Sequence, residues 1–266
     1  MIARFEGKVD LRPAHHNTTI KDTFFGRRVY IVDVALTEAE MRRIQAEASE
    51  VIWLDHHQTS VPLQASLGWG RIEQHHSGAT LAWDHCFGDQ ALPDILAYVR
   101  DKDLWQWRLP HSRAICTALD QDIGDEDIPR VLDIDPAGLI ERGTALRQKI
   151  MTEVTMIARR GVAVSEPYGL RKVTALVVNN LNHVNEVGDL AVRATSDGGL
   201  GHHLAICFGL RQDGRWIHSL RSSAGVDCER IAANRGGGGH KQSASYLADR
   251  PFPLSMDCLD WPVSLD

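Results

Sequence analysis

Short hydrophobic runs that end in ionisable residues mark the first third of the chain. Val29–Val32 is an apolar run followed by Asp33, and Val51–Leu54 is a second run followed by Asp55. Between them a helix is predicted to begin at Thr37, because acidic residues follow it and apolar residues recur at helical spacing. Strand, helix and strand at this spacing predict a βαβ unit with parallel strands. Sites in open α/β sheets form at the carboxyl ends of strands, so both aspartates become candidates.

The rest of the chain divides into a helical middle and a β-rich end. Helices are predicted over 77–87 and 92–99, and a long helix over 137–160 follows a segment rich in Asp, Gly and Pro at 120–136. That acidic segment is interpreted as a solvated connector, and the long helix is expected to link two domains. The β-rich end is predicted to contain strands at 173–178, 203–210 and 214–221 and a helix at 226–234. Asp213-Gly214 predicts a hairpin turn.

Composition places the chain among globular proteins and excludes several classes. It has 266 residues, 43% hydrophobic and 24% charged, with a net charge of −6. The charge argues against a broad nucleic-acid footprint but allows a local basic groove. No apolar run of about 18 residues occurs, so neither a membrane span nor a membrane partner is expected, and the first residues do not resemble a signal peptide. Five widely spaced cysteines without a CxxC argue against a disulfide scaffold or zinc finger, and predict a cytoplasmic location.

Carboxylates and imidazoles at the predicted strand ends form the first candidate site. The set consists of Asp33, Asp55, His56, His57 and Asp101. Carboxylate oxygens and imidazole nitrogens together suit Mn²⁺ and similar cations. Such cations can hold both the attacking water and the leaving oxygen of a phosphate ester. Taken singly, each residue is better interpreted as a strand-end cap or a surface side chain, so the metal interpretation depends on their occurring together at the ends of two adjacent strands.

A run of glycines near the end of the chain forms the second candidate site. The run precedes His240 and comprises Gly236, Gly237, Gly238 and Gly239. Glycines allow close approach of the backbone, and consecutive N–H groups with a helix start behind them can hold a phosphate. The spacing matches neither a dinucleotide-binding nor a P-loop motif, and a flexible loop is the alternative. Arg221, at the end of a predicted strand, is either a phosphate-binding fork or a surface arginine.

Three motifs resemble the DHH phosphoesterase superfamily with a C-terminal DHHA1 domain. They are IVD at Ile31–Asp33, LDHH at Leu54–His57 and GGGGH at Gly236–His240. SGATLAW at Ser77–Trp83 and RDKDLWQW at Arg100–Trp107 are further similar to the oligoribonuclease, or nanoRNase, branch. The resemblance runs from about residue 4 to about residue 250.

The resemblance implies an α/β fold with a parallel-sheet DHH domain and a smaller α/β DHHA1 domain joined by a helical linker. The expected boundaries are 1–128 for the DHH domain, 129–163 for the linker, 164–255 for the DHHA1 domain and 256–266 for a tail. The family uses two Mn²⁺ ions to hydrolyse phosphodiester bonds in short oligoribonucleotides or linear dinucleotides. A phosphatase of 3′,5′-bisphosphonucleotides and a catalytically impaired nucleotide-binding remnant are the alternatives. Whether the chain forms a homodimer stays open.

The resemblance also implies roles for single residues. Asp33 matches the carboxylate that bridges the metals, and His56 matches a metal ligand. His57 matches a residue beside the scissile phosphate, as an acid or a charge stabiliser, while Asp55 matches an acidic residue that orients its neighbours. In the second domain, the glycine run with His240 matches the phosphate-handling motif.

One part of the family pattern is absent from this sequence. The family begins with a His-x-Asp-x-Asp-like motif that supplies three metal ligands, and nothing similar precedes Asp33. By the family pattern one metal would keep Asp33, His56 and Asp101, with Asp103 as the alternative to Asp101, and the other metal would keep Asp33 alone. We therefore expect one well-formed Mn²⁺ site and weak or no two-metal catalysis.

Three explanations of the absent motif are open. The true start lies upstream, the gene encodes a truncated remnant, or a partner chain supplies the ligands, which is the least favoured of the three. His15 and His16 are disfavoured as substitutes for the missing ligands, because they lie in a loop-like stretch.

Overall fold

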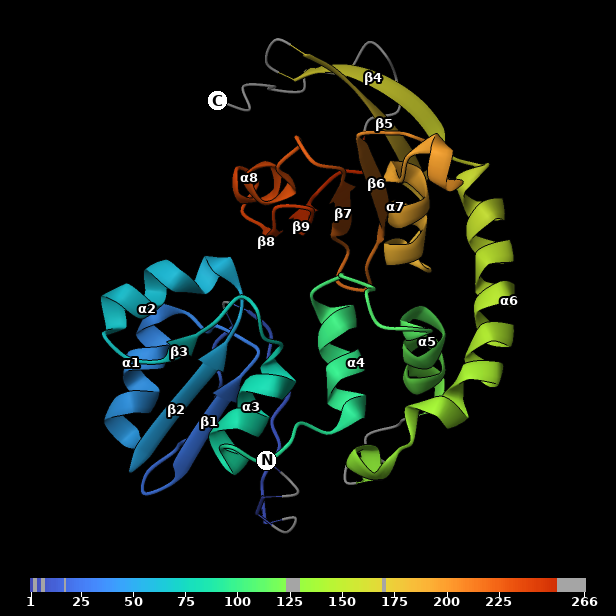
Figure 1. The fold of residues 1–266 in the computed structure, drawn as a ribbon. Coiled ribbons are helices and arrows are strands. Elements are labelled where there is room, and N and C mark those ends of the chain that lie inside the picture. The colour runs from blue at the N-terminus through green and yellow to red at the C-terminus, as the bar shows by residue number, and fades with distance from the viewer. Residues whose placement is uncertain (2–3, 6–7, 17, 123–129, 169–170, 253–266) are drawn as a thin grey trace. The chain divides into compact units, whose positions relative to one another are not determined.

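The computed structural model describes residues 1, 4–5, 8–16, 18–122, 130–168 and 171–252 (Figure 1). The chain divides into two compact units, Met1–Arg147 and Gln148–Asp266. Part of the acidic connector, 123–129, and the predicted tail, 256–266, lie outside the described residues. Each unit is described separately below.

The predicted βαβ unit is confirmed in the first unit. Strands β1 (Arg28–Val32) and β2 (Glu50–Asp55) pair in parallel and are connected by α1 (Glu38–Glu47). Thr37 caps α1 as expected, and its hydroxyl accepts the N–H of Glu40. The short strand β3 (Arg71–Ile72) pairs in parallel with β2, so that among the described residues the sheet has the order β1-β2-β3.

Alternate side chains of β1 face opposite sides of this sheet, as the period of a strand requires. Ile31 packs with Met41 and Ile44 of α1 in one buried cluster. Tyr30 points the other way, where its ring lies 5.7 Å from that of His85, a residue of the helix over 78–87 on the opposite side of the sheet (Figure 1). Both faces of the short sheet are therefore covered.

Helices complete the first unit. Ser77 caps the predicted helix at 77–87 through a reciprocal pair of bonds with Thr80. The helix predicted over 92–99 begins two residues later than expected, at Asp94, and continues past its predicted end to Asp103. The elements are η1 (Gln58–Ser60), α2 (Val61–Leu67), α3 (Gly78–Phe87), α4 (Asp94–Asp103) and α5 (Ser112–Asp122).

The predicted long helix crosses the division between the two units. A short 3-10 turn, η3 (Pro136–Leu139), leads into α6 (Ile140–Ala158). Early in α6, Gly143 allows close contact with α5, because a Cβ there would lie 1.9 Å from the carbonyl oxygen of Ala114. Late in α6, Val154 and Ala158 are buried in the second unit against its sheet. One helix thus packs within both units.

The second unit is built on a mixed sheet, which in the described part of the chain has the order β4-β5-β6-β7-β9-β8. β5 and β6 are parallel, and the other neighbours are antiparallel. The hairpin at Asp213-Gly214 joins β6 to β7 as expected, with Gly214 at φ +79°. The strands are β4 (Val162–Tyr168), β5 (Arg171–Asn179), β6 (Leu204–Leu210), β7 (Trp216–Ser222), β8 (Gly238–His240) and β9 (Ser243–Ala248).

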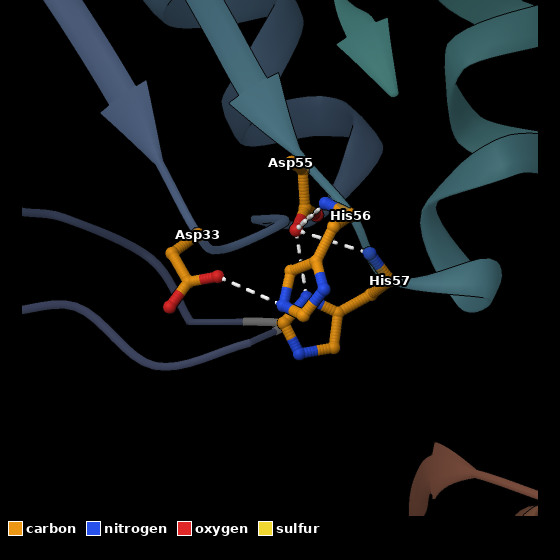
Figure 2. A group of neighbouring side chains, drawn as sticks. All are labelled: Asp33, Asp55, His56 and His57. Atoms are coloured by element: carbon orange, nitrogen blue, oxygen red, sulfur yellow. Dashed lines mark hydrogen bonds and ion pairs between the residues drawn. The ribbon is translucent and has the colours of Figure 1, made fainter. Parts of the chain in front are cut away.

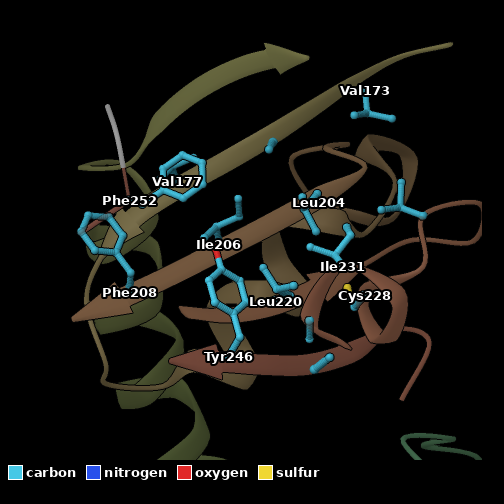
Figure 3. Packing of buried hydrophobic residues seen from close by; sticks show 14 residues of the cluster. Val173, Val177, Leu204, Ile206, Phe208, Leu220, Cys228, Ile231, Tyr246 and Phe252 are labelled. Carbon is cyan, nitrogen blue, oxygen red and sulfur yellow. The ribbon is translucent and has the colours of Figure 1, made fainter. Parts of the chain in front are cut away.

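Both faces of this sheet are buried by helices. Helix α7 (Val184–Val192) and the end of α6 pack on one face. Helix α8 (Cys228–Ala233) packs on the other face, where Ile206, Leu220 and Ile231 belong to a single cluster (Figure 3). Burial on both faces explains why β6 reads as a continuous apolar run in the sequence.

Candidate metal centre

The register of β1 and β2 brings two aspartates and two histidines together. Val32 pairs with Leu54, and the N–H of Asp33 donates to the carbonyl of Leu54 over 2.9 Å. The next residues along each strand therefore leave the same edge of the sheet. One ligand atom from each of Asp33, Asp55, His56 and His57 lies within 4.8 Å of the other three (Figure 2). The strand ends therefore bring together four members of the predicted set, and Asp101 is not among them.

Asp33 is held in place by its backbone and by α3. Its φ of +63° lies in the left-handed region, which non-glycine residues rarely adopt and which Asp tolerates better than most. Gly78, the first residue of α3, packs directly against it. A Cβ at Gly78 would lie 2.4 Å from the Cβ of Asp33 and 2.8 Å from its Oδ1. The position of this carboxylate therefore depends on a glycine 45 residues further along the chain.

Asp55 is fully buried and orients the residues around it. Its Oδ1 accepts the backbone N–H groups of His56 and His57, at 2.7 and 3.3 Å, and its Oδ2 accepts the hydroxyl of Ser60 at 2.5 Å. Burial by itself raises the pKa of this carboxyl, but the hydrogen bonds from His57 and Ser60 outweigh it and lower the pKa of Asp55 to about 2. Asp55 is therefore a permanent acceptor at neutral pH.

The ionised state of Asp55 fixes the proton arrangement of His57. Nδ1 of His57 lies 2.7 Å from Oδ1 of Asp55. A carboxylate can only accept, so Nδ1 carries the proton and donates it. In the neutral ring, Nε2 then has the lone pair, and Figure 2 shows this side of the ring turned away from Asp55. Hydrogen bonding of one imidazole nitrogen to a carboxylate is the arrangement that prepares the other nitrogen for a metal or a proton.

His56 lies between two carboxylates. Its buried Nε2 is 3.1 Å from Oδ1 of Asp33 and 3.4 Å from Oδ2 of Asp103. Burial opposes protonation of the ring, yet the hydrogen bond to Asp33 and the charge of Asp103 raise the pKa of His56 above its usual value. Burial also raises the pKa of Asp103, which the charge on His56 partly offsets. Each group changes the titration of the other.

The structure places the two candidate carboxylates of α4 in different surroundings. Asp101, which the sequence interpretation assigned to the metal, accepts the N–H groups of Arg108 and Leu109 over 2.9 and 3.3 Å. It is buried and holds the loop that follows the helix. Asp103, the alternative, is the carboxylate beside His56. The geometry therefore favours Asp103 as the fourth-motif carboxylate.

His16 also lies beside the cluster. Its Nδ1 accepts the N–H of Ala35 over 3.1 Å, and its ring centroid is 4.5 Å from that of His57. Partial burial, and then the neighbouring His57, lower the pKa of His16. The N-terminal segment is fixed to α1 nearby, where the N–H of Ile20 donates to Glu40. Sequence reasoning disfavoured this histidine, because an extended segment without periodicity gives no signal of what its side chains contact.

The glycine run has a structural explanation within the second unit. It begins after the end of α8 and continues into β8, so the helix precedes the run. In the described part of the chain no helix begins after the run, contrary to the expectation. A Cβ at Gly237 would lie 2.1 Å from the carbonyl oxygen of Ser245, and one at Gly239 would lie 2.5 Å from that of Ser243. Gly236 and Gly239 also have positive φ. Close packing against β9 therefore requires glycine here with or without a ligand.

At Gly238 and His240, the other two parts of this motif, the structure sets weaker constraints. Open space surrounds the Cβ position of Gly238. His240 ends β8, is half-buried and pairs with Ser243 of β9.

Arg221 is half-buried at the end of β7 and is already engaged. Its guanidinium donates to Oδ1 of Asn185 from Nε, over 3.1 Å, and from Nη2, and to the carbonyl of Leu220 from Nη1, over 2.7 Å. Gly188 makes room for its side chain, since a Cβ there would lie 2.4 Å from Cγ of Arg221. Burial lowers the pKa of this guanidinium. Residues of α7 therefore hold the side chain of Arg221 in one orientation. A surface arginine that moved freely would lack these contacts.

The donor set of the first unit fits a divalent cation. Carboxylate oxygens from Asp33 and Asp103 and imidazole nitrogens from His56 and His57 are the ligand types that suit Mn²⁺ and related ions. The ionised, hydrogen-bonded Asp55 behind them matches the outer residues that orient metal-binding histidines. The arrangement can therefore bind a metal ion and, beside it, an anionic group.

Comparisons with known proteins give distant matches. No established family profile matches the chain. An alignment 124 positions long is 23% identical to an uncharacterized protein of Acanthamoeba polyphaga mimivirus. It covers 41% of this chain and only 28% of that protein's length.

Among solved structures, the chain is similar to a pGpG-specific phosphodiesterase, PggH, from Vibrio cholerae. The two share 12% sequence identity, and the match covers 84% of this chain and 92% of that one with a TM-score of 0.43. It is also similar to an exopolyphosphatase-related protein from Bacteroides fragilis, with 14% identity, coverage of 86% and 67%, and a TM-score of 0.42. A putative family II inorganic pyrophosphatase from Methanococcus jannaschii has 13% identity, coverage of 91% and 80%, and a TM-score of 0.27.

The structure also bears on membrane association. Among the described residues, none of the helices combines the length and the apolar character that crossing a bilayer requires.

Proposed function

We propose that this chain is a metal-dependent phosphoesterase of the DHH/DHHA1 type, which hydrolyses phosphodiester bonds of short oligoribonucleotides or linear dinucleotides. The observation that carries the proposal is the cluster of Asp33, Asp55, His56 and His57 at the ends of two parallel strands. Its residues are those of the IVD and DHH motifs. This coincidence of two motifs at one edge of the sheet supports the proposal.

The proposed metal ligands are Asp33, His56 and Asp103. Nε2 of His56 lies 3.1 Å from the carboxylate of Asp33 and 3.4 Å from that of Asp103. One well-formed site for Mn²⁺ follows from this set. A divalent cation held by these residues would lower the pKa of a water molecule and would offset the charge of a phosphate.

The other residues of the cluster position protons and charge. Asp55 holds the ring of His57 through Nδ1, so that Nε2 can receive a proton from water or face a phosphate oxygen. When the ring of His57 is protonated, it can donate to a departing oxygen. Since Asp55 is fully buried and bound to Ser60, its own role is to orient His57.

We assign substrate binding to the second unit, through Arg221, the glycine run at 236–239 and His240. The support is the oriented guanidinium of Arg221 and the open space beside Gly238, where nothing lies within 4 Å of a Cβ position. An arginine held by Asn185 keeps some of its donors in a defined direction, which suits binding of a phosphate.

The test is Mn²⁺-dependent hydrolysis of a labelled RNA dinucleotide by the 266-residue chain. His56→Ala is the active-site variant, and His75→Ala, at an exposed position of the same unit, is the matched control. We expect turnover that requires Mn²⁺, falls at least a hundredfold in His56→Ala and persists in His75→Ala. The products should be mononucleotides.

Other results would point elsewhere. Release of inorganic phosphate from a 3′,5′-bisphosphonucleotide, without cleavage of the dinucleotide, would favour a phosphatase. Binding of the dinucleotide with Mn²⁺ but without turnover, by a chain shown to be folded, would favour a nucleotide-binding protein and contradict the proposed activity.

A further inference from the structure

The loop after α4 contains a cluster of unusual backbone conformations. Trp105, Trp107 and His111 have φ values of 54°, 55° and 57°, in the left-handed region that favours glycine. Positive φ is a genuine outlier for bulky side chains. Such conformations persist where the surrounding structure imposes them, and they occur preferentially at functional sites.

Both the side chain and the backbone carbonyl of Asp101 hold the loop in this conformation. Its carboxylate accepts the N–H groups of Arg108 and Leu109. Its backbone carbonyl accepts the N–H of Gln106 over 2.9 Å and that of Trp107 over 3.5 Å. A single buried aspartate therefore holds the loop in a shape that its own sequence disfavours.

The loop presents an aromatic surface next to a cation. The rings of Trp105 and Trp107 meet edge to face with centroids 4.9 Å apart. The guanidinium of Arg113, from α5, lies 4.5 Å from the centroid of Trp107 and 5.9 Å from that of Trp105. Trp105 nevertheless stays 39% exposed. A tryptophan that served only the core would be buried, as Trp53 is at 1%.

The chain connects this surface closely to the candidate metal centre. Trp105 follows Asp103 by two residues, so their Cα atoms are at most about 7 Å apart. The carboxylate of Asp103 contacts His56. The backbone of Trp105 is thus connected within two residues to a proposed metal ligand of the first unit.

We propose that Trp105, supported by Trp107 and Arg113, is a stacking subsite for a nucleobase of the substrate. Bases stack on exposed aromatic faces irrespective of their sequence, and a nearby arginine adds a favourable cation–π contribution and can contact a phosphate. This inference rests on the proposed function and narrows it, because inorganic polyphosphates and base-free phosphate esters would gain nothing from such a surface.

The subsite is tested by comparing the affinities of the chain for 5′-AMP and for ribose 5-phosphate. Both affinities are measured by calorimetry in the presence of Mn²⁺. The two ligands share a phosphate and a ribose and differ in the base, and neither contains a phosphodiester bond. The variants are Trp105→Ala, Trp105→Leu, which keeps apolar bulk without a flat ring, and Trp105→Phe. Phe25→Ala removes another exposed aromatic ring of the same unit and is the matched control.

We expect Trp105→Ala and Trp105→Leu to weaken 5′-AMP binding about tenfold or more, a loss typical of one stacked base. Trp105→Phe should lose less than about threefold, since it restores a ring, and Phe25→Ala should lose nothing. Binding of ribose 5-phosphate should be equal in all variants, and so should the affinity for Mn²⁺ alone.

Three results would overturn the subsite. The first is equal affinity of the unaltered chain for both ligands, and the second is unchanged affinity of Trp105→Leu for 5′-AMP. The third is an equal loss of affinity for both ligands in the Trp105 variants, which would show a purely structural role. Failure of the proposed activity looks different. In that case 5′-AMP binding would still depend on Trp105 while the dinucleotide remained uncleaved.

Discussion

Oδ2 of Asp103 lies 3.4 Å from Nε2 of His56 at the end of β2. A carboxylate in this position shares the proposed metal with His56. We expect Asp103→Asn to weaken Mn²⁺ binding at least tenfold, because an amide is a weaker ligand than a carboxylate, and to leave the free energy of unfolding nearly unchanged. Calorimetric titration with Mn²⁺ and chemical denaturation of the metal-free chain measure the two effects.

Asp101 supplies the matched comparison two residues earlier. Its carboxylate accepts two backbone N–H groups and is buried. Asp101→Asn keeps one acceptor oxygen but brings a buried NH₂ toward a donor, so we expect a loss of about 1–3 kcal/mol of stability. A tenfold loss of Mn²⁺ affinity in Asp101→Asn, with no loss in Asp103→Asn, would reverse this assignment.

Gly78→Ala is expected to disturb the metal centre without altering any ligand. The added Cβ would approach the Cβ of Asp33 to 2.4 Å, a separation that one of the two must relieve by moving. We expect weaker Mn²⁺ binding and about 1–3 kcal/mol lower stability, the usual effect of overpacking. Gly138→Ala is the control, since nothing lies within 4 Å of a Cβ there. Equal metal affinities in the two variants would show that α3 does not position Asp33.

Asp55→Asn should destabilise the first unit in a pH-dependent manner. The pKa of Asp55 is about 2 in the folded chain, against an ordinary value of 3.8. Its stabilising contribution is therefore present above pH 3.8 and is lost as the pH falls toward 2, and it amounts to about 2 kcal/mol. Denaturation of the metal-free chain at pH 7 should show this loss in Asp55→Asn and none in Asp89→Asn, an exposed position. Equal stabilities would mean that the bonds of Asp55 do not stabilise the fold.

His218 should make the second unit sensitive to acid. It is buried between Phe208 and Tyr246, with its ring nearly parallel to both, and Nδ1 has no hydrogen-bond partner among the described residues. Burial, together with the charge of Arg235, lowers the pKa of His218 from 6.5 to about 4. Between these values the unfolded chain binds a proton that the folded chain does not, so stability falls as the pH falls, by about 3 kcal/mol at most.

His218→Phe removes the titrating ring and keeps the stack. We expect the variant to be at least as stable as the original chain at pH 7. Calorimetric melting between pH 7 and pH 4.5 should then show a smaller decrease in melting temperature for the variant. Parallel decreases in the two proteins would assign the acid sensitivity to other groups.

Much of the fold follows from periodicity, and the departures have physical causes. The βαβ unit, the capped helix at 78–87 and the central strand at 204–210 carry strong local patterns, and the structure contains them. Helix α4 extends past its predicted end because the charged residues of its last turn carry no apolar signal. The helix over 184–192 was not predicted, and it begins after His183 at a φ of 52°, a start without a usual capping residue.

Only the residues of the site that directly follow a strand could be predicted from the sequence. Asp33, Asp55, His56 and His57 follow two strands whose pairing the sequence implies. Residues at positions 101 and 103 of a helix point about 200° apart, so only the packing of α4 decides which of them meets His56. His16 comes from a segment without periodicity.

The backbone of Asp33 restricts what evolution can place there. At a φ of +63°, Asn, Asp and Gly are the residues with the smallest conformational penalty. A descendant of this chain that lost its metal would therefore be expected to drift toward Asn or Gly at this position rather than to an arbitrary residue. For the same reason Asp33→Asn separates charge from shape at this strand end, whereas Asp33→Ala would alter both.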